Sequence, residues 1–145
     1  TSYEYLFMLT RNICKSQEDI EELFKRMVLN ILCLNFDDHA KNFAYLMDKN
    51  GKWSLSPAYD ITYSKGLMKS HTTTICGKDL DIVRDDILKI AKAQGIKITS
   101  AIRIIDNCIE IVKTFEQKAK ELDLDISTLE ECKREINNQI ELLRI

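Results

Sequence analysis

The octet NFDDHAKN, at residues 35 to 42, places two carboxylates, an imidazole, a lysine and two amides directly after a strongly apolar run. Asp37 and Asn42 lie five positions apart, and Asp60 follows 18 residues after Asn42. Carboxylate and amide oxygens are ligands that Mg²⁺ accepts alongside phosphate oxygens. A further Asp nearby can act as a base or orient an attacking hydroxyl. These residue types indicate metal-assisted chemistry on a phosphate group, provided that the chain brings Asp60 back to the octet.

The segment between the octet and Asp60 predicts a β-hairpin. Apolar residues alternate on both sides of the dipeptide Asn50-Gly51, which is typical of a tight hairpin turn. The alternating positions are Phe43, Tyr45, Met47, Trp53 and Leu55. Pro57 has no N–H to donate and ends the pairing. A hairpin brings its two ends together, so we expect Asp60 to lie close to Asn42.

Helical patterns occupy most of the remaining chain. Apolar residues recur at spacings of three and four before the octet, as on one face of an amphipathic helix. The predicted helices span residues 2–13, 17–34, 84–94, 100–121 and 127–143. Residues 61–80 show no clear period and predict a long loop. The fold class is therefore mainly α, with one β-hairpin inserted after the second helix.

Several local signals set the details of these helices. Ser16 with Asp19, and Ser127 with Glu130, have the spacing of capping boxes at helix starts. Thr99 or Ser100 is expected to cap the long helix, and Gly95 to end the one before it. The apolar stripe of the first helix is predicted to be Tyr5, Leu6, Leu9 and Ile13.

Composition limits the classes of protein to which the chain can belong. The 145 residues are the length of one domain, and 45% hydrophobic with 30% charged residues describe a globular chain. A formal net charge of −2 gives no support for direct nucleic-acid binding, and no apolar run is long enough to cross a membrane. Five scattered cysteines, an odd number, indicate free thiols in the cytoplasm. Cys33 and Cys108 fall on apolar faces and are expected to be small core residues.

The order of the candidate residues matches the template for phosphoryl transfer in protein kinases. That template has a catalytic-loop Asp, an Asn five positions later, a hairpin and then a metal-binding Asp. NFDDHAKNF, the hairpin and LSPAYDI together resemble the C-terminal lobe of the HipA family of serine/threonine-protein kinases, which are toxins of toxin–antitoxin modules. The segment IVRDDILKIAKAQGI is similar to the helical segment that follows in that family, so the resemblance covers about residues 17–96.

The resemblance implies roles for individual residues and a set of cofactors. Asp37 would be the catalytic Asp, and Asn42 and Asp60 would hold Mg²⁺ on the phosphates of ATP. Lys41 would face phosphate or substrate, and His39 would brace the loop. The substrate would be a protein hydroxyl.

The same resemblance implies that part of a kinase lies outside this sequence. The family's N-terminal lobe carries a phosphate-covering loop and a lysine paired with an acidic residue, and these 145 residues have no room for either. The sequence also begins with Thr1. Residues 1–145 are therefore expected to be a HipA-like C-terminal kinase lobe, as a fragment or as one partner of a split kinase. Its expected partners are the missing lobe, a protein substrate and a DNA-binding antitoxin.

Other interpretations remain open at this point. The chain could be an inactive helical interaction module that keeps the kinase-lobe fold, or a metal-dependent hydrolase. The octet could be a solvated turn, and Asp60 could simply cap a turn. His71, among threonines, is expected to be an exposed loop residue, and a nucleophilic pair of Cys76 with His71 lacks an evident orienting partner.

Overall fold

The computed structural model describes residues 1–65 and 67–145 and is mainly helical, with one two-stranded antiparallel hairpin, which confirms the predicted fold class. The elements are α1 (Tyr3–Cys14), α2 (Gln17–Leu32), the 3₁₀ helix η1 (Ala40–Asn42), β1 (Tyr45–Met47), β2 (Trp53–Leu55), α3 (Arg84–Ala93), α4 (Ile98–Lys113), α5 (Phe115–Glu121) and α6 (Ile126–Arg144). No helix among the described residues is long and apolar enough to cross a membrane.

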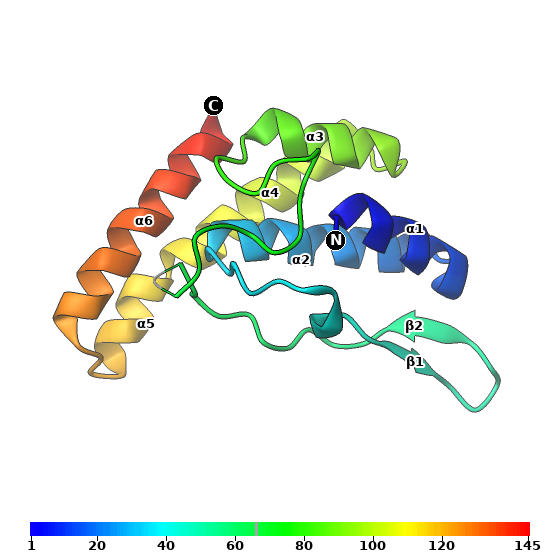
Figure 1. Ribbon diagram of the computed structural model, residues 1–145, viewed down its shortest axis with the longest axis horizontal. Helices are drawn as coiled ribbons and strands as arrows, with labels where there is room; N and C mark the ends of the chain where they lie inside the picture. Colours follow the sequence, from blue (N-terminus) through cyan, green and yellow to red (C-terminus); the bar gives the residue numbers. More distant parts are fainter. Residues whose placement is uncertain (66) are drawn as a thin grey trace.

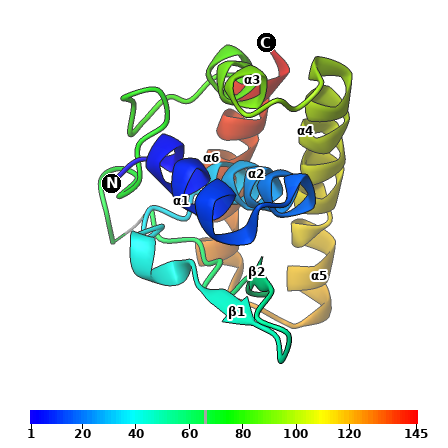
Figure 2. The ribbon, with the colours of Figure 1, turned by 90° about the vertical axis from the view of Figure 1, so that its right-hand side faces the viewer.

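Helix α2 lies at the centre of the molecule. Helix α1 packs on one side of it and α4 on the other, with α3 above and the hairpin below (Figure 2). Helix α6 lies beyond the carboxyl end of α2 (Figure 1). The apolar face predicted for α2 is buried, at Ile20, Leu23, Phe24, Met27, Val28, Ile31 and Leu32. Each such side chain contributes about 1.5–3 kcal/mol through removal from water, so this helix carries much of the core.

The buried face of α1 differs from the predicted stripe. Its buried residues are Tyr3, Leu6, Phe7, Thr10 and Cys14, whereas the side chain of Tyr5 is 52% exposed. The reason is that two polar groups on this face find partners. The hydroxyl of Thr10 lies 2.7 Å from that of Tyr45, and the hydroxyl of Tyr3 donates to Asp38. An apolar pattern cannot anticipate such pairs, because the partners are 35 residues away.

The predicted hairpin is confirmed. Tyr45 pairs with Leu55 and Met47 with Trp53, and Gly51 takes a φ of 81° in the turn. That φ favours glycine, because a side chain there would be strained. The predicted capping role of Asp19 is wrong. Ser16 precedes α2 without a side-chain capping bond, and Asp19 Oδ1 instead accepts a hydrogen bond from the backbone N–H of Leu55, 2.9 Å away. Asp19 therefore ties the hairpin to α2.

The long helix predicted to run from residue 100 to 121 is interrupted at Thr114. Helix α4 ends at Lys113 and α5 begins at Phe115. The Thr114 hydroxyl donates to the carbonyl of Ile111 at 2.7 Å, a local bond that competes with regular helical bonding.

The starts of two helices also differ from the predictions. Helix α4 begins at Ile98, after Lys97, so neither predicted residue caps it. Helix α6 begins one residue early, because the side chain of Asp125 caps it by accepting from the N–H of Ser127. The predicted loop is confirmed. No helix or strand lies among the described residues between β2 and α3, although Thr74 forms an isolated bridge with Ser2. The end of α3 before Gly95, with its φ of 72°, is confirmed too.

Candidate functional site

The chain turns sharply after α2 and presents the octet at the surface. Leu34 takes a φ of 51°, a left-handed conformation that costs a non-glycine residue about 1–3 kcal/mol. Its burial helps to offset that cost. The side chain of Asp37 is 55% exposed, and its backbone N–H donates to Ser64 Oγ at 3.1 Å. His39 Nε2 lies 3.7 Å from Asp37 Oδ1. Asp37 is thus held by its backbone and leaves its carboxylate accessible.

Asn42 and Asp60 line the same small cavity, of about 10 Å³. Asn42 Nδ2 donates to the carbonyl of Asp37 at 2.8 Å, which leaves Oδ1 of Asn42 as the acceptor end of the amide. Asp60 has a φ of 53°, and its side chain is exposed. Lys41 is exposed as well, and its carbonyl accepts from the hydroxyl of Tyr59 at 2.8 Å. The hairpin therefore returns Asp60 to Asn42, as expected.

A buried carboxylate next to Asp37 organises the loop, and the sequence analysis missed it. Asp38 is fully buried and accepts from the Tyr3 hydroxyl (3.1 Å) and from the N–H groups of Thr72 (3.0 Å) and Thr73 (3.1 Å). Its Oδ2 atom also lies 3.0 Å from Nδ1 of His71. Burial, and then the charge of Asp38, raises the pKa of Tyr3 well above its usual value. A carboxylate with four partners anchors the loop at residues 71–73 beneath the octet.

The prediction that His71 is an exposed loop residue is wrong. His71 is buried, and its ring packs edge-on against Phe36 with centroids 4.6 Å apart. The residues around His71 did not indicate its burial, because its partners come from the octet, more than 30 positions earlier. The alternative of a Cys76–His71 nucleophilic pair also fails. Cys76 Sγ donates to the carbonyl of Asp86, and burial raises the pKa of the Cys76 thiol, which disfavours the thiolate.

Hydrogen bonds continue from Asp38 to Asp60 through two buried amides. Asn30 Nδ2 donates to the Tyr3 hydroxyl at 3.0 Å. Asn35 Nδ2 in turn donates to Asn30 Oδ1 and to the carbonyl of Asp60, both at 3.0 Å. The chain Asp38–Tyr3–Asn30–Asn35–Asp60 therefore joins the octet to the return of the hairpin. The signal in the sequence is a polar Asn30 among the apolar residues of the α2 pattern.

Arg26 is a second buried polar residue of α2 that the sequence analysis missed. Its Nη2 donates to the carbonyl of Ser56, and its Nε donates to Glu22 at 3.3 Å. Its Nη1 is buried and has no hydrogen-bond partner among the described residues. Arg26 lines the same small cavity as Asn42 and Asp60. The buried guanidinium therefore places a positive charge beside the small cavity of Asn42 and Asp60.

A family model described as the HipA-like C-terminal domain matches residues 1–118. The chain belongs to this family. The match contains the octet, the hairpin and Asp60, and it ends within α5. The resemblance drawn from residues 17–96 is thereby confirmed.

A solved structure described as the toxin–antitoxin system HipA, HipB and operator DNA complex of Shewanella oneidensis MR-1 is also similar. The TM-score is 0.79 at 17% identity, over 99% of this chain and 36% of that one. At this identity the similarity shows that the HipA-like fold extends through α6, and the chain spans about a third of the matched protein. A search of curated proteins finds no match.

Proposed function

We propose that this HipA-like domain is the C-terminal lobe of an ATP- and Mg²⁺-dependent serine/threonine-protein kinase. In this proposal Asp37 orients or deprotonates the acceptor hydroxyl of a protein substrate, and Asn42 and Asp60 hold the metal. Lys41 faces phosphate or substrate from the exposed surface of η1. The observation that carries the proposal is the shared cavity of Asn42 and Asp60, with Asn42 bonded to the backbone of Asp37.

The donor set fits Mg²⁺ better than a metal held wholly by protein. Mg²⁺ in phosphoryl-transfer sites is held by one or two carboxylates together with phosphate oxygens and water. No group of three His, Cys, Asp or Glu side chains able to hold a metal exists among the described residues. Oδ1 of Asn42, which takes no part in the bond to Asp37, and the exposed carboxylate of Asp60 suit a metal–phosphate pair. Bound Mg²⁺ would neutralise charge on the phosphates.

Within this proposal the chain's own residues do positioning work. The backbone bonds of Asp37 hold its carboxylate facing outward, where an acceptor hydroxyl can approach. The amide chain from Asp38 to Asp60 keeps the two halves of the site in register. The nucleotide-covering lobe and an antitoxin partner are further parts of the proposal, supported by family membership and by the HipA–HipB complex that resembles this fold.

The test is phosphotransfer by a longer protein that contains this chain, with ATP and Mg²⁺. We expect Asp37→Ala and Asp60→Ala to reduce turnover by at least about 100-fold without loss of folding. The matched control is Asp85→Asn, which changes an exposed carboxylate on α3 and should retain activity. Calorimetry would show metal-dependent ATP binding that Asp60→Ala removes. Full activity in both alanine variants would overturn the assigned roles.

A second candidate function is that of an inactive interaction module. It is favoured by large apolar side chains exposed on α1 and on the neighbouring hairpin, namely Tyr5, Met8, Leu46, Met47 and Trp53. Such a surface suits contact with another lobe or protein in an active and in an inactive protein alike. The discriminating measurement is activity after the missing lobe has been supplied. A complete protein that binds its partner but neither ATP nor Mg²⁺ would support the interaction module.

A further inference from the structure

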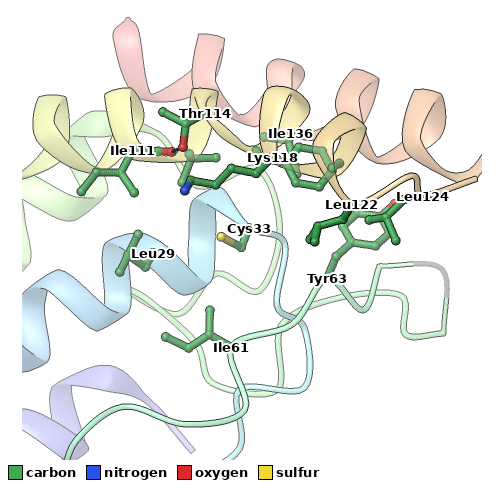
Figure 3. Close-up of a pocket in the computed structure, with 13 residues that line it drawn as sticks. Leu29, Cys33, Ile61, Tyr63, Ile111, Thr114, Lys118, Leu122, Leu124 and Ile136 are labelled. Carbon is green, nitrogen blue, oxygen red and sulfur yellow. Dashed lines mark hydrogen bonds between the residues drawn. The ribbon is translucent and has the colours of Figure 1, made fainter. Parts of the chain in front are cut away.

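An apolar cavity of about 440 Å³ adjoins α2, and Ile61 lines both this cavity and the small cavity of Asn42 and Asp60. Helix α2 and the segment that follows Asp60 form one wall, and the α4–α5 junction and α6 form the other (Figure 3). Its lining residues are Leu29, Cys33, Ile61, Tyr63, Ile111, Val112, Thr114, Phe115, Lys118, Ala119, Leu122, Leu124 and Ile136. The volume falls within the range of about 300–1,000 Å³ that is typical of small-molecule sites.

The lining is mostly apolar from the inner wall to the mouth. Val112 and Ala119 are buried at the inner wall, and the half-buried thiol of Cys33 has its pKa raised to about 11 by burial. At the mouth, Ile111 is 62% exposed and Leu122 is 72% exposed. Leaving these side chains in water forgoes stabilisation that an apolar occupant would supply. The cavity therefore suits an aliphatic or aromatic group.

Among the described residues that line the cavity, Lys118 is the one with a charge. Its side chain lies along the wall, with the nitrogen on the side of Thr114 (Figure 3). Nearby lysines have carboxylate partners: Lys113 pairs with Glu110 at 3.0 Å, and both Lys120 and Lys133 pair with Glu116 at 2.9 Å. In the described part of the chain, Lys118 has no acidic partner within 4.0 Å. A cation without a partner, beside an apolar cavity, is complementary to an acidic group at one end of an apolar ligand.

We propose that this cavity binds a small amphiphile with an aliphatic tail and a carboxylate head. The tail lies between α2 and α5, and the carboxylate lies against Lys118. The head remains near solvent because Lys118 is exposed, so the ion pair adds specificity and little affinity. The proposal uses none of Asp37, Asn42 or Asp60, and it stands independently of phosphotransfer.

The test measures binding of decanoate and of decanol to the protein by calorimetry, below their aggregation limits. We expect one saturable decanoate site per chain. Lys118→Gln should weaken decanoate binding about fivefold and leave decanol binding unchanged. The matched control is Lys120→Gln on the same helix, which lies outside the cavity and should not change decanoate binding. Absence of saturable decanoate binding would overturn the proposal, as would equal binding of both ligands with no effect of Lys118→Gln.

Two further variants test the place of the tail. Ala119→Phe fills the buried inner wall and should abolish binding of both ligands, with thermal unfolding as the check that the protein still folds. Leu122→Ser changes an exposed residue at the mouth, is tolerated by folding, and should weaken both ligands severalfold. Unchanged binding in Leu122→Ser would place the ligand elsewhere. An acidic amphipathic helical peptide that binds where decanoate does not would assign the cavity to a protein partner and overturn the proposal.

Discussion

Two neighbouring faces of α2, here called the polar face and the apolar face, differ in how strictly their contacts fix the geometry of the chain around them. Arg26 and Asn30, four residues apart, face the candidate site, where buried amides and a buried carboxylate are joined by directional hydrogen bonds. Leu29 and Cys33, also four residues apart, face the apolar cavity, where the contacts have no preferred direction. Hydrogen bonds between buried groups weaken steeply when geometry changes, whereas apolar packing tolerates adjustment.

The difference suits the two roles proposed for this helix. In the proposed function, the polar face holds the Asp37 loop and Asp60 in one arrangement, because phosphoryl transfer depends on positioning. The apolar face leaves space that an occupant can enter at little structural cost. Substitutions on the polar face should therefore lower stability more than substitutions on the apolar face.

The largest effect is expected from Asp38→Ala. Removing this carboxylate takes a hydrogen-bond partner from the buried residues Tyr3, His71 and Thr73, so we expect unfolding to become about 3–5 kcal/mol easier. The neighbouring Asp37→Ala should change the free energy of unfolding by less than about 0.5 kcal/mol, because its side chain is exposed. Urea unfolding of the two variants measures the contrast. Equal losses of stability in the two variants would mean that the buried hydrogen bonds of Asp38 do not hold the polar face in place.

Asn30→Ala interrupts the chain of amides between Tyr3 and Asn35. We expect a loss of about 2 kcal/mol, since a buried hydroxyl and a buried amide each lose a partner. Asn107→Ala, at an exposed position of α4, is the control and should be nearly neutral. In the longer protein, Asn30→Ala should also weaken metal-dependent ATP binding. Unchanged ATP binding would show that the chain of amides does not position the candidate site.

Tyr3 makes the polar face sensitive to alkali. Its pKa is raised in the folded protein, so its contribution to stability is present below the unfolded pKa of about 10 and is lost as pH rises above that value. Between pH 9 and 11 the wild type should lose about 1 kcal/mol more than Tyr3→Phe. Tyr63, whose pKa burial raises to about 12, and the other tyrosines are common to both proteins. Parallel pH profiles of unfolding would contradict this expectation.

The smallest effect is expected on the apolar face. Leu29→Ala enlarges a cavity that is already open, so we expect a loss of about 1 kcal/mol or less. Leu23→Ala is the comparison, because Leu23 is fully buried in α2 and its truncation should cost about 2–5 kcal/mol. Thermal and urea unfolding of both variants would measure the difference. A loss for Leu29→Ala as large as for Leu23→Ala would show that the cavity wall is packed as tightly as the core.

Much of the candidate site could be predicted because it is local. The spacing of Asp37 and Asn42, the Asn50-Gly51 turn and the alternating strands lie within a few residues of one another, and a hairpin must return Asp60 to its start. The core helix α2 was predictable from its apolar period. The break at Thr114 was not, because a hydroxyl bond to the Ile111 carbonyl competes only weakly with regular helical bonding and leaves no clear signal in the sequence.

The sequence by itself determined the helical class, the hairpin and the order of the candidate residues, since each follows from periodicity, turn chemistry and spacing along the chain. Tertiary structure alone decided that Asp38 is buried, that His71 is its partner and that Asp19 ties down the hairpin. It also decided that Arg26 lies beside the small cavity of Asn42 and Asp60, and that Lys118 lies beside the apolar cavity without an acidic partner among the described residues. The physical reason is that a charged or polar side chain is buried only where distant segments supply its hydrogen bonds, and no local pattern records those segments.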